Sequence, residues 1–576
     1  MVHPPTPSQP PDTTGPARRG MSREEFRVIA ASSVGTAFEW YDFFLYGSLI
    51  PVIGSKFFGG YPPAAQTVFA LLTFGIGFVV RPLGALVWAR FGDLVGRKAI
   101  FMITLIIMGL STLAVGLLPT SAEIGWAAPV LLLTCRVLQG LAISGEFGGA
   151  VTYVAEHAPP ARRGAFVGWL PATVALSIFL SLGVLLSVQF ITGPEAFDAW
   201  GWRLPFLISV VPLAISVWIR LKLRESPLFL RMKAEGAQSR APIRESFTRR
   251  RNLRVVLIAL AMVAAQSFVG YVSTFYTLTL LTSTLKVDTL TANTLFLGLM
   301  LCAFLLCGFF SWLSDKVGRK PVMLAGFALA VATYFPIFHG VAALANPALA
   351  EAQDRVRIQL VADPADCSFQ FNPAGTASFT SDCDRAKQLL ARWSAAYENV
   401  AGRPDAPVTV VVDGRTLTAG PGLEAELGDA LTRAGYPAEG SGTVRIDGPG
   451  DLLDGRVVLL FLLLLALVSY AQMTQGPAAS AMVELFPTRI RYTAMSLPFQ
   501  VGTGWFGGVA PAVMVAINAE AGNIFAGLWY PTIMIVIGAV ICLLALPETR
   551  GIDLDAVDTA ARPARRLARR RGTAVG

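Results

Sequence analysis

Charged residues are scarce in this chain of 576 residues: Asp, Glu, Lys and Arg make up only 15% of it, against about 25% in an ordinary soluble domain. Histidine occurs three times and cysteine six times, and no His or Cys spacing is typical of a metal site. Apolar residues of the AVILMFWYC set reach 54%, more than domains in water could bury. The composition therefore excludes a soluble enzyme and a disordered protein, and it indicates an integral membrane protein.

Long apolar segments recur along the chain. A membrane-spanning helix needs about 20 mostly apolar residues, and twelve segments are long enough. We therefore predict an all-α membrane protein, because twelve long runs are not compatible with the short buried strands of a soluble protein. The predicted spans are 28–55, 64–90, 99–120, 129–155, 165–191, 203–220, 254–283, 289–312, 321–345, 457–482, 492–518 and 524–547.

Basic residues are distributed unevenly among the connections between spans. Residues 220–254 carry eleven basic and three acidic residues, whereas the connections 51–63, 121–128 and 192–202 hold one basic residue between them, Lys56. Because Lys and Arg are enriched in cytoplasmic loops, we expect a multi-pass protein of the cytoplasmic (inner) membrane with both termini cytoplasmic. For the arginine-rich tail we expect contact with membrane lipid and not with nucleic acid.

One long connection between the ninth and tenth predicted spans contains no span. It carries 9 basic and 16 acidic residues, and its place in the chain predicts an extracytoplasmic location. Valine-rich sequence on both sides of Asp413-Gly414 predicts a β-hairpin over 408–417, and we expect helices at 385–399 and 422–434. The predicted insert is a small α/β domain that an extracytoplasmic partner could bind. Two of its residues could form a disulfide in an oxidising compartment: Cys367 and Cys383.

These features predict a series of domains along the chain. Two six-helix halves are separated by a basic linker, and the second half is interrupted by the insert. The predicted divisions are a disordered N-terminal tail at 1–20, a first half at 21–220, a cytoplasmic linker at 221–253, a second half at 254–345 and 456–548, the inserted domain at 346–455, and a basic cytoplasmic tail at 549–576.

Two short loops nearly duplicate one another. Residues 92–98 read GDLVGRK and residues 314–320 read SDKVGRK, with six predicted spans between equivalent positions, as expected for two halves in parallel register. Each loop combines a basic cluster with an acid able to pair at helix ends in one conformational state. We interpret both loops as gates, although a signal for topology alone is the alternative. The gating candidates are Gly92, Asp93, Gly96, Arg97, Lys98, Asp315, Gly318, Arg319 and Lys320.

Charged residues deep within the predicted spans occur only in the first half. Such residues are costly in hydrocarbon and are usually functional. Glu39 and Asp42 share one helix face, so each should raise the proton affinity of the other, and Arg136 could bind either acid or a substrate carboxylate. A static ion-pair network is the alternative. The candidates for proton coupling and substrate binding are Glu39, Asp42, Arg81, Arg136, Gln139 and Glu146.

Neutral polar and aromatic residues occupy the spans of the second half. They could line a pocket at the membrane midplane, or they could hold helices together. No glycine-rich phosphate loop followed by Lys-Ser/Thr is present, so ATP is not expected to drive a reaction, and no cofactor or enzyme chemistry is expected. The candidate pocket residues are Tyr41, Gln266, Tyr271, Tyr470 and Gln472.

Seven further motifs follow one another along the chain. They are GTAFEWYDFFLYG at 35–47, RPLG at 81–84, RVLQG at 136–140, SGEFGG at 144–149, GWRLPF at 201–206, RESP at 224–227 and ELFPTRIR at 484–491. With the two duplicated loops, they make the sequence resemble the major facilitator superfamily. In this order they are similar to its metabolite:H⁺ symporter family, which includes carriers for α-ketoglutarate, citrate, shikimate and proline or betaine.

The resemblance implies a twelve-helix fold and the proton-coupled import, by alternating access, of a small organic acid or a zwitterionic metabolite or osmolyte. It also implies that the motif in the fourth span contributes to proton coupling. It implies nothing about the insert, which the usual pattern lacks. Two alternatives remain at this stage: a proton-antiport exporter, and a transporter-like sensor that captures solute with the insert.

Overall fold

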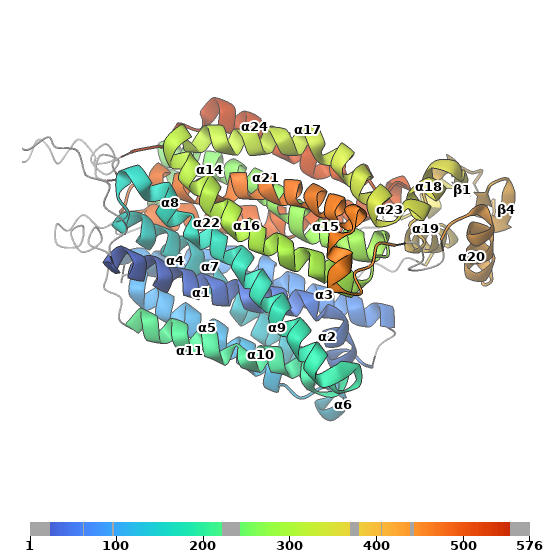
Figure 1. Cartoon of the computed structure of the whole chain (residues 1–576), viewed down its shortest axis with the longest axis horizontal. Coiled ribbons are helices and arrows are strands. Elements are labelled where there is room, and N and C mark those ends of the chain that lie inside the picture. The colour runs from blue at the N-terminus through green and yellow to red at the C-terminus, as the bar shows by residue number, and fades with distance from the viewer. Residues whose placement is uncertain are drawn as a thin grey trace, which may run out of the picture.

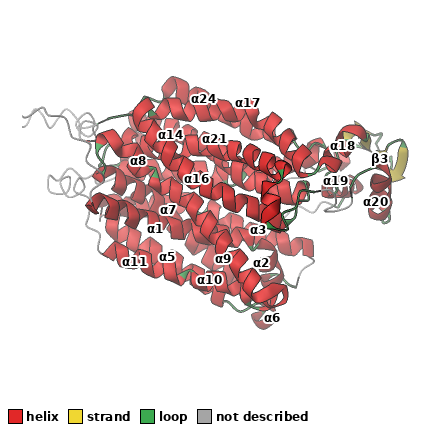
Figure 2. Ribbon diagram, viewed as in Figure 1, coloured by secondary structure: helices red, strands yellow, loops and turns green. Residues whose placement is uncertain are grey.

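The computed structural model describes residues 23–60, 63–94, 97–221, 242–368, 380–404, 406–437, 443–552 and 554. Helices account for most of it and lie roughly along one common direction (Figure 2). In Figure 1 the helices of the first half, blue to teal, lie mostly below those of the second half, green to red. The small insert projects from one end of this bundle, opposite the end at which the first helix begins.

The first half contains helices that are broken where the sequence places proline or glycine. Proline cannot donate the helical hydrogen bond and clashes with the preceding turn, so the Arg81-Pro82 step separates two helices, and Gly193 (φ 75°) before Pro194 bends another. The helices are α1 (Arg23–Ser48), α2 (Ile50–Phe57), α3 (Pro63–Val79), α4 (Arg81–Leu94), α5 (Arg97–Leu117), α6 (Ser121–Ile124), α7 (Ala127–His157), α8 (Arg163–Val167), α9 (Trp169–Ala199), α10 (Leu204–Ile208) and α11 (Val210–Leu221).

The second half contains three π-helical segments, a form that is rare and is frequently found at functional sites. Two of them follow α14 and one follows α22. The elements are α13 (Pro242–Thr248), α14 (Arg250–Tyr271), π-helix η3 (Val272–Tyr276), α15 (Thr277–Thr279), π-helix η4 (Leu280–Thr284), α16 (Thr289–Val317), α17 (Arg319–Ala345), α21 (Gly455–Leu485), α22 (Arg491–Gln500), π-helix η7 (Val501–Gly507), α23 (Ala510–Ala521) and α24 (Trp529–Ala545).

The structure confirms an all-α membrane architecture with a small sheet-containing insert. Within the described residues, nine helices are long and apolar enough to cross a membrane, beginning with Ala127–His157. The predicted spans 28–55, 64–90 and 99–120 are also helical, but the described apolar stretches there are shorter, at Leu72–Trp88 and Met102–Leu117. The count of twelve spans therefore stays a prediction.

The insert is a four-stranded sheet with three helices. Strand order is β2-β1-β3-β4, with β1 parallel to β2 and the other neighbours antiparallel. Buried side chains on one face of β1 and β3 belong to the apolar core that the insert shares with the second half. Its elements are α18 (Pro347–Arg355), β1 (Ile358–Ala362), α19 (Asp382–Arg392), β2 (Glu398–Ala401), β3 (Thr409–Val412), β4 (Arg415–Thr418) and α20 (Leu423–Ala434).

Local predictions for the insert meet different outcomes. The hairpin is confirmed: Val412 pairs with Arg415, and the two turn residues have the positive φ values, 47° and 84°, that suit Asp-Gly. The helix predicted at 422–434 is present. The helix predicted at 385–399 is wrong in its second part, because α19 ends at Arg392 and residues 398–401 pair with β1 as a parallel strand. Pairing with a distant strand overrides local helical preference there.

The insert docks on the ends of helices of the second half. Lys387 Nζ lies 2.7 Å from Glu520 Oε1 at the end of α23, and Ser394 Oγ donates to the Thr284 carbonyl of η4 over 2.8 Å. The Tyr397 amide donates to the carbonyl of Gly522 over 2.9 Å. Within the insert the structure places Cys367 and Cys383 in a disulfide, with Cα atoms 5.3 Å apart.

Candidate functional site

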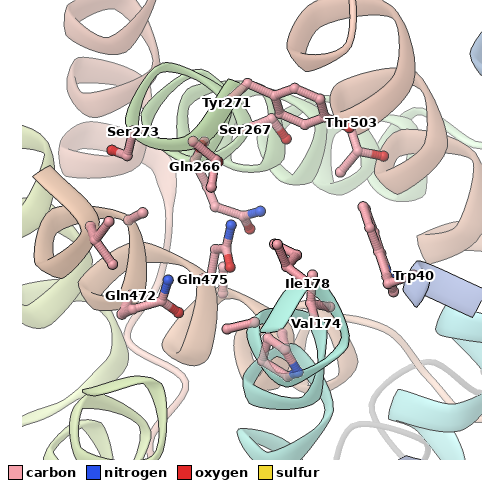
Figure 3. A pocket seen from close by; sticks show the side chains of 18 of the residues that line it. Trp40, Val174, Ile178, Gln266, Ser267, Tyr271, Ser273, Gln472, Gln475 and Thr503 are labelled. Carbon is pink, nitrogen blue, oxygen red and sulfur yellow. The ribbon is translucent and has the colours of Figure 1, made fainter. Parts of the chain in front are cut away.

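A cavity lies between the two halves. Trp40 of α1 and Ile178 of α9 line it from the first half, and amides from α14 and α21 line it from the second. Figure 3 shows Gln266 and Gln475 pointing into this space, with Trp40 across from them. Both halves of the molecule therefore contribute to one site, which is mainly apolar and carries a few polar groups.

No Asp, Glu, Lys or Arg is among the described residues that line this cavity. Its polar groups are amides and hydroxyls: Gln266, Gln472 and Gln475, with Ser267, Ser273, Thr274, Thr503 and Tyr271. Gln472 Oε1 and Ser267 Oγ are buried without a hydrogen-bond partner among the described residues. Buried polar atoms are normally satisfied, so Gln472 Oε1 can accept a hydrogen bond from a bound solute, and Ser267 Oγ can accept or donate one.

The structure places three of the five predicted pocket residues at the cavity: Gln266, Tyr271 and Gln472. The other two residues make contacts elsewhere in this arrangement, and their place in the pocket stays a prediction. Tyr41 donates to the Pro205 carbonyl over 2.9 Å, inside the first half, and Tyr470 Oη accepts from Thr333 Oγ1 over 3.2 Å. One residue corresponds to about 100° of helix rotation, so Trp40 and not its neighbour Tyr41 faces the cavity.

Gln475, one of the neutral polar residues that the sequence places in the spans of the second half, lies three positions after Gln472 on the same helix and also lines the cavity. Other residues at the cavity, Trp40 and Thr503 among them, escaped the sequence prediction. Trp40 carries no comparable signal, because an aromatic residue in a span is most often a packing residue. Thr503 lies in a π-helical segment, whose changed rotation the sequence does not indicate.

A buried acid–base pair lies in the first half. Asp42 Oδ2 is 3.8 Å from Arg136 Nη1, and the two side chains are 0% and 3% exposed. The Arg136 guanidinium also lies 3.5 Å from the centre of the Tyr46 ring. The distance allows Coulomb attraction but not a strong hydrogen bond, so this is a loose pair of buried charges.

Other residues predicted for coupling surround this pair to different degrees. Gln139 Nε2 donates to Thr112 Oγ1 over 3.0 Å, one helical turn from Arg136. Arg81 is buried at 2% exposure among aromatic rings, 4.4 Å from the centre of Phe78 and 5.8 Å from that of Trp40. It therefore lies behind a wall residue of the cavity. The side chains of Glu39 and Glu146 lie outside the described part of the structure.

The second of the duplicated loops bridges the two halves. Asp315 accepts hydrogen bonds from the backbone amides of Gly164 and Ala165 in the first half, over 2.8 and 2.7 Å. It also pairs with Arg319 over 2.7 Å. A Cβ at residue 164 would lie 2.3 Å from Arg319 Nη1, so this approach needs glycine. At this end of the bundle the halves are in contact.

Glu484 of α21 joins the same cluster, which the sequence analysis did not predict. Its Oε1 lies 3.2 Å from Arg163 Nη1 of the first half and 3.3 Å from Arg319 Nη2 of the second. A second bridge, Arg491 Nη1 to Glu156 Oε1, measures 2.8 Å. Glu484 and Arg491 begin and end the ELFPTRIR motif, but their partners are distant in the chain, so sequence alone offers no pairing.

The remaining gating candidates differ in position. Lys320 Nζ donates to carbonyls of Leu543 and Leu546 over 2.7 and 3.0 Å, so in this arrangement it joins parts of the second half, and its role in gating stays a prediction. Gly318 has φ 121°, a conformation that favours glycine. The candidates of the first duplicated loop either lie outside the described residues or have side chains that the structure does not describe. They are Gly92, Asp93, Gly96, Arg97 and Lys98.

Comparison with known proteins places this geometry in a family. The model of the family "Sugar (and other) transporter" matches residues 28–245, 232–353 and 452–561, leaving most of the insert outside the match. The shikimate transporter of Escherichia coli K12 is 34% identical over 315 residues, covering 54% of this chain and 72% of that protein. The proline/betaine transporter of Salmonella typhimurium LT2 is 33% identical, and the match covers 54% of this chain and 64% of that protein.

Among solved structures, the proton:xylose symporter XylE bound to 6-bromo-6-deoxy-D-glucose shares the fold with a TM-score of 0.60 at 15% identity, covering 94% of this chain and 100% of that one. The two-half arrangement, the intervening cavity and the match to the family model agree with one another. The chain therefore belongs to the sugar (and other) transporter family of the major facilitator superfamily, a family of multi-pass membrane transporters.

Proposed function

We propose that this chain is a proton-coupled symporter that imports a small organic acid or a zwitterionic metabolite or osmolyte across the cytoplasmic membrane. Both termini would be cytoplasmic, no bound cofactor takes part, and the coupling ion is H⁺. The observation that carries the proposal is the buried Asp42–Arg136 pair in the first half.

The loose pair suits a group that gains and loses a proton. Two buried charges 3.8 Å apart form only a weak pair, and protonation of Asp42 would leave Arg136 buried without its counter-charge. Arg136 is then left to Tyr46 and its other neighbours, so protonation changes the charge balance between α1 and α7. A proton that reaches Asp42 from outside would thus alter the packing of the first half, whose Trp40 lines the cavity.

The inter-half cluster supports alternating access as the mechanism. Asp315, Glu484 and Glu156 each bind a group of the opposite half, so the cavity cannot open at this end until these contacts break. Carriers of this kind rock their halves around a fixed central site. The cluster is the gate that such rocking would release, with Asp315 and Arg319 in the role predicted for them.

The lining of the cavity supports a solute of low net charge. Amides, hydroxyls and aromatic faces can bind hydroxyl groups, a single carboxylate or an alkylated ammonium group, and no described lining residue offers the full positive charge that a di- or tricarboxylate needs. Relatives named for shikimate and for proline or betaine fall within these limits.

The test is uptake into proteoliposomes of a panel of carboxylates, amino acids, betaines and sugars, with and without an inward proton gradient. Accumulation of a compound only with the gradient, and its loss in Asp42→Asn, is the expected result. Movement of the solute in exchange for protons that move in the opposite direction would instead establish antiport. Solute binding by folded protein without any transport would identify the sensor that the insert could form.

A further inference from the structure

Three arginines lie at the end of the bundle opposite the insert, where α14 begins. Arg250, Arg251 and Arg254 are exposed and line a cavity formed with Leu485 at the end of α21, Ala545 at the end of α24, and Pro547 just beyond it. The first and third arginines also line a second cavity, between α14 and α24, together with Ile541. The two cavities share residues, so they form one continuous groove.

The groove changes character along its length. Its second part is lined by Leu253, Leu257 and Ile541 below the arginines, and Leu253 and Leu257 expose 36% and 55% of their surface. Tight packing of the two helices underlies it, since a Cβ on Gly538 of α24 would lie 2.4 Å from the Cβ of Ala265 of α14. A cluster of positive charge thus meets an open apolar groove on the surface between α14 and α24.

The protein itself leaves this charge uncompensated within the described residues, where none of the three arginines forms an ion pair. The neighbouring acid, Glu245, is already bound by two other arginines: Arg489 Nη2 lies 2.6 Å and Arg249 Nη1 lies 3.4 Å from Glu245 Oε1. The three exposed guanidinium groups form a positive cluster that attracts anions.

We propose that this groove binds an anionic phospholipid, with its phosphate on Arg250, Arg251 and Arg254 and an acyl chain along Leu253, Leu257 and Ile541. Guanidinium groups bind phosphate oxygens in pairs, and basic pockets between membrane helices bind anionic headgroups. The apolar part of the groove distinguishes a lipid from a free phosphate ion. An acyl chain would contact it, whereas a phosphate ion would not.

The position of the groove predicts what the lipid does. Its walls come from α14, α21 and α24, all in the second half, so the lipid fastens helices of one half and does not bridge the halves. Bound lipid should therefore raise the thermal stability of the protein without closing the inter-half gate. The site is independent of the proposed substrate and coupling ion.

The experiment measures lipid retention by native mass spectrometry on the full-length protein, after exchange into mixtures of phosphatidylethanolamine and phosphatidylglycerol. We expect the wild type to retain phosphatidylglycerol, and R250Q/R251Q/R254Q to retain it at least about tenfold less, since each arginine near a membrane surface contributes to anion attraction. The control R385Q/R415Q/R433Q removes the same charge from exposed positions of the insert and should retain lipid like the wild type.

Equal loss in both triple variants would show general electrostatics and overturn the proposal, as would unchanged retention in R250Q/R251Q/R254Q. If that variant does not fold, competition on the wild type decides the question. Phosphatidylglycerol should displace phosphatidylethanolamine and raise the melting temperature, and inorganic phosphate alone should do neither. Stabilisation by inorganic phosphate to the same extent would identify a free-anion site instead of a lipid site.

Discussion

Replacing Glu484 by Gln is the sharpest test of the inter-half gate. Glu484 Oε1 pairs with Arg163 of the first half and Arg319 of the second, and these three side chains are at most 3% exposed. Removing one member of a buried ion pair costs about 3–5 kcal/mol, because its partner is left buried and unpaired. Arg319 keeps its pair with Asp315 over 2.7 Å, so the cost falls on Arg163. Opening the gate would return Arg163 to water, so most of this cost falls on the closed arrangement.

A native cysteine reports on this change. Cys307 of α16 is 0% exposed, and its Sγ lies 3.7 Å from the Gly168 carbonyl of the first half, so opening of the gate would expose it. At about 1.4 kcal/mol for each factor of ten, a shift of 3 kcal/mol should speed its reaction with a maleimide by about 100-fold. The measurement uses protein in which the other free cysteines, Cys135, Cys302 and Cys542, are replaced by alanine.

The matched control is Glu424→Gln on the insert, which removes an Arg392–Glu424 pair of 2.8 Å whose members are 67% and 66% exposed. Exposed pairs contribute about 0–1 kcal/mol, so labelling of Cys307 should not change. If Glu484→Gln, shown to be folded, labels at the wild-type rate, the cluster is a passive contact and the gating interpretation fails.

Three further predictions concern coupling, specificity and the insert. Asp42→Asn should reduce gradient-driven accumulation at least about tenfold while leaving substrate exchange measurable, because a neutral side chain cannot take up the proton; equal loss of both activities would point to a structural role. Gln475→Leu should raise KM by about fivefold to tenfold, from loss of one hydrogen bond, with the dependence on the proton gradient retained, whereas Leu at Tyr470 should leave KM unchanged. Mass mapping without reductant should find Cys367 joined to Cys383, and replacement of both by Ser should lower the free energy of unfolding of the insert by about 3 kcal/mol; two free thiols in the purified protein would contradict the pairing.

Much of the fold follows from local sequence. Apolar length alone places the helices, and the Asp413-Gly414 turn identifies its hairpin because positive φ is a local property. Residues 398–401 show the limit: their strand exists only because β1 lies beside them, and β1 is distant in the chain. The sequence indicates some of the helix breaks, at Pro82 and Gly193-Pro194. No comparable residue pattern indicates the π-helical segments.

The candidate site was predictable in its chemistry more than in its geometry. A charge in a span is costly whichever neighbour it meets, so Asp42 and Arg136 could be named from sequence, and their pairing required only that α1 and α7 pack together. Sequence alone does not tell which of Trp40 and Tyr41 faces the cavity, because the facing direction turns about 100° with each residue. Glu484 lies at the end of an apolar helix, where an acidic residue is expected to be solvated. Its pairing with Arg163 is visible only in the structure.

The insert and the gate lie at opposite ends of the second half, and this arrangement bears on what the insert can do. It binds the outer ends of η4 and α23, through Thr284 and Glu520. Those two chain segments lead inward to η3 and η7, whose Thr274 and Thr503 line the cavity. Because its described polar contacts with the helices are made to the second half, the insert is free to travel with that half when the halves rock. An inserted domain of this kind can hold cavity-lining helices in place without preventing the cavity from opening alternately to the two sides of the membrane.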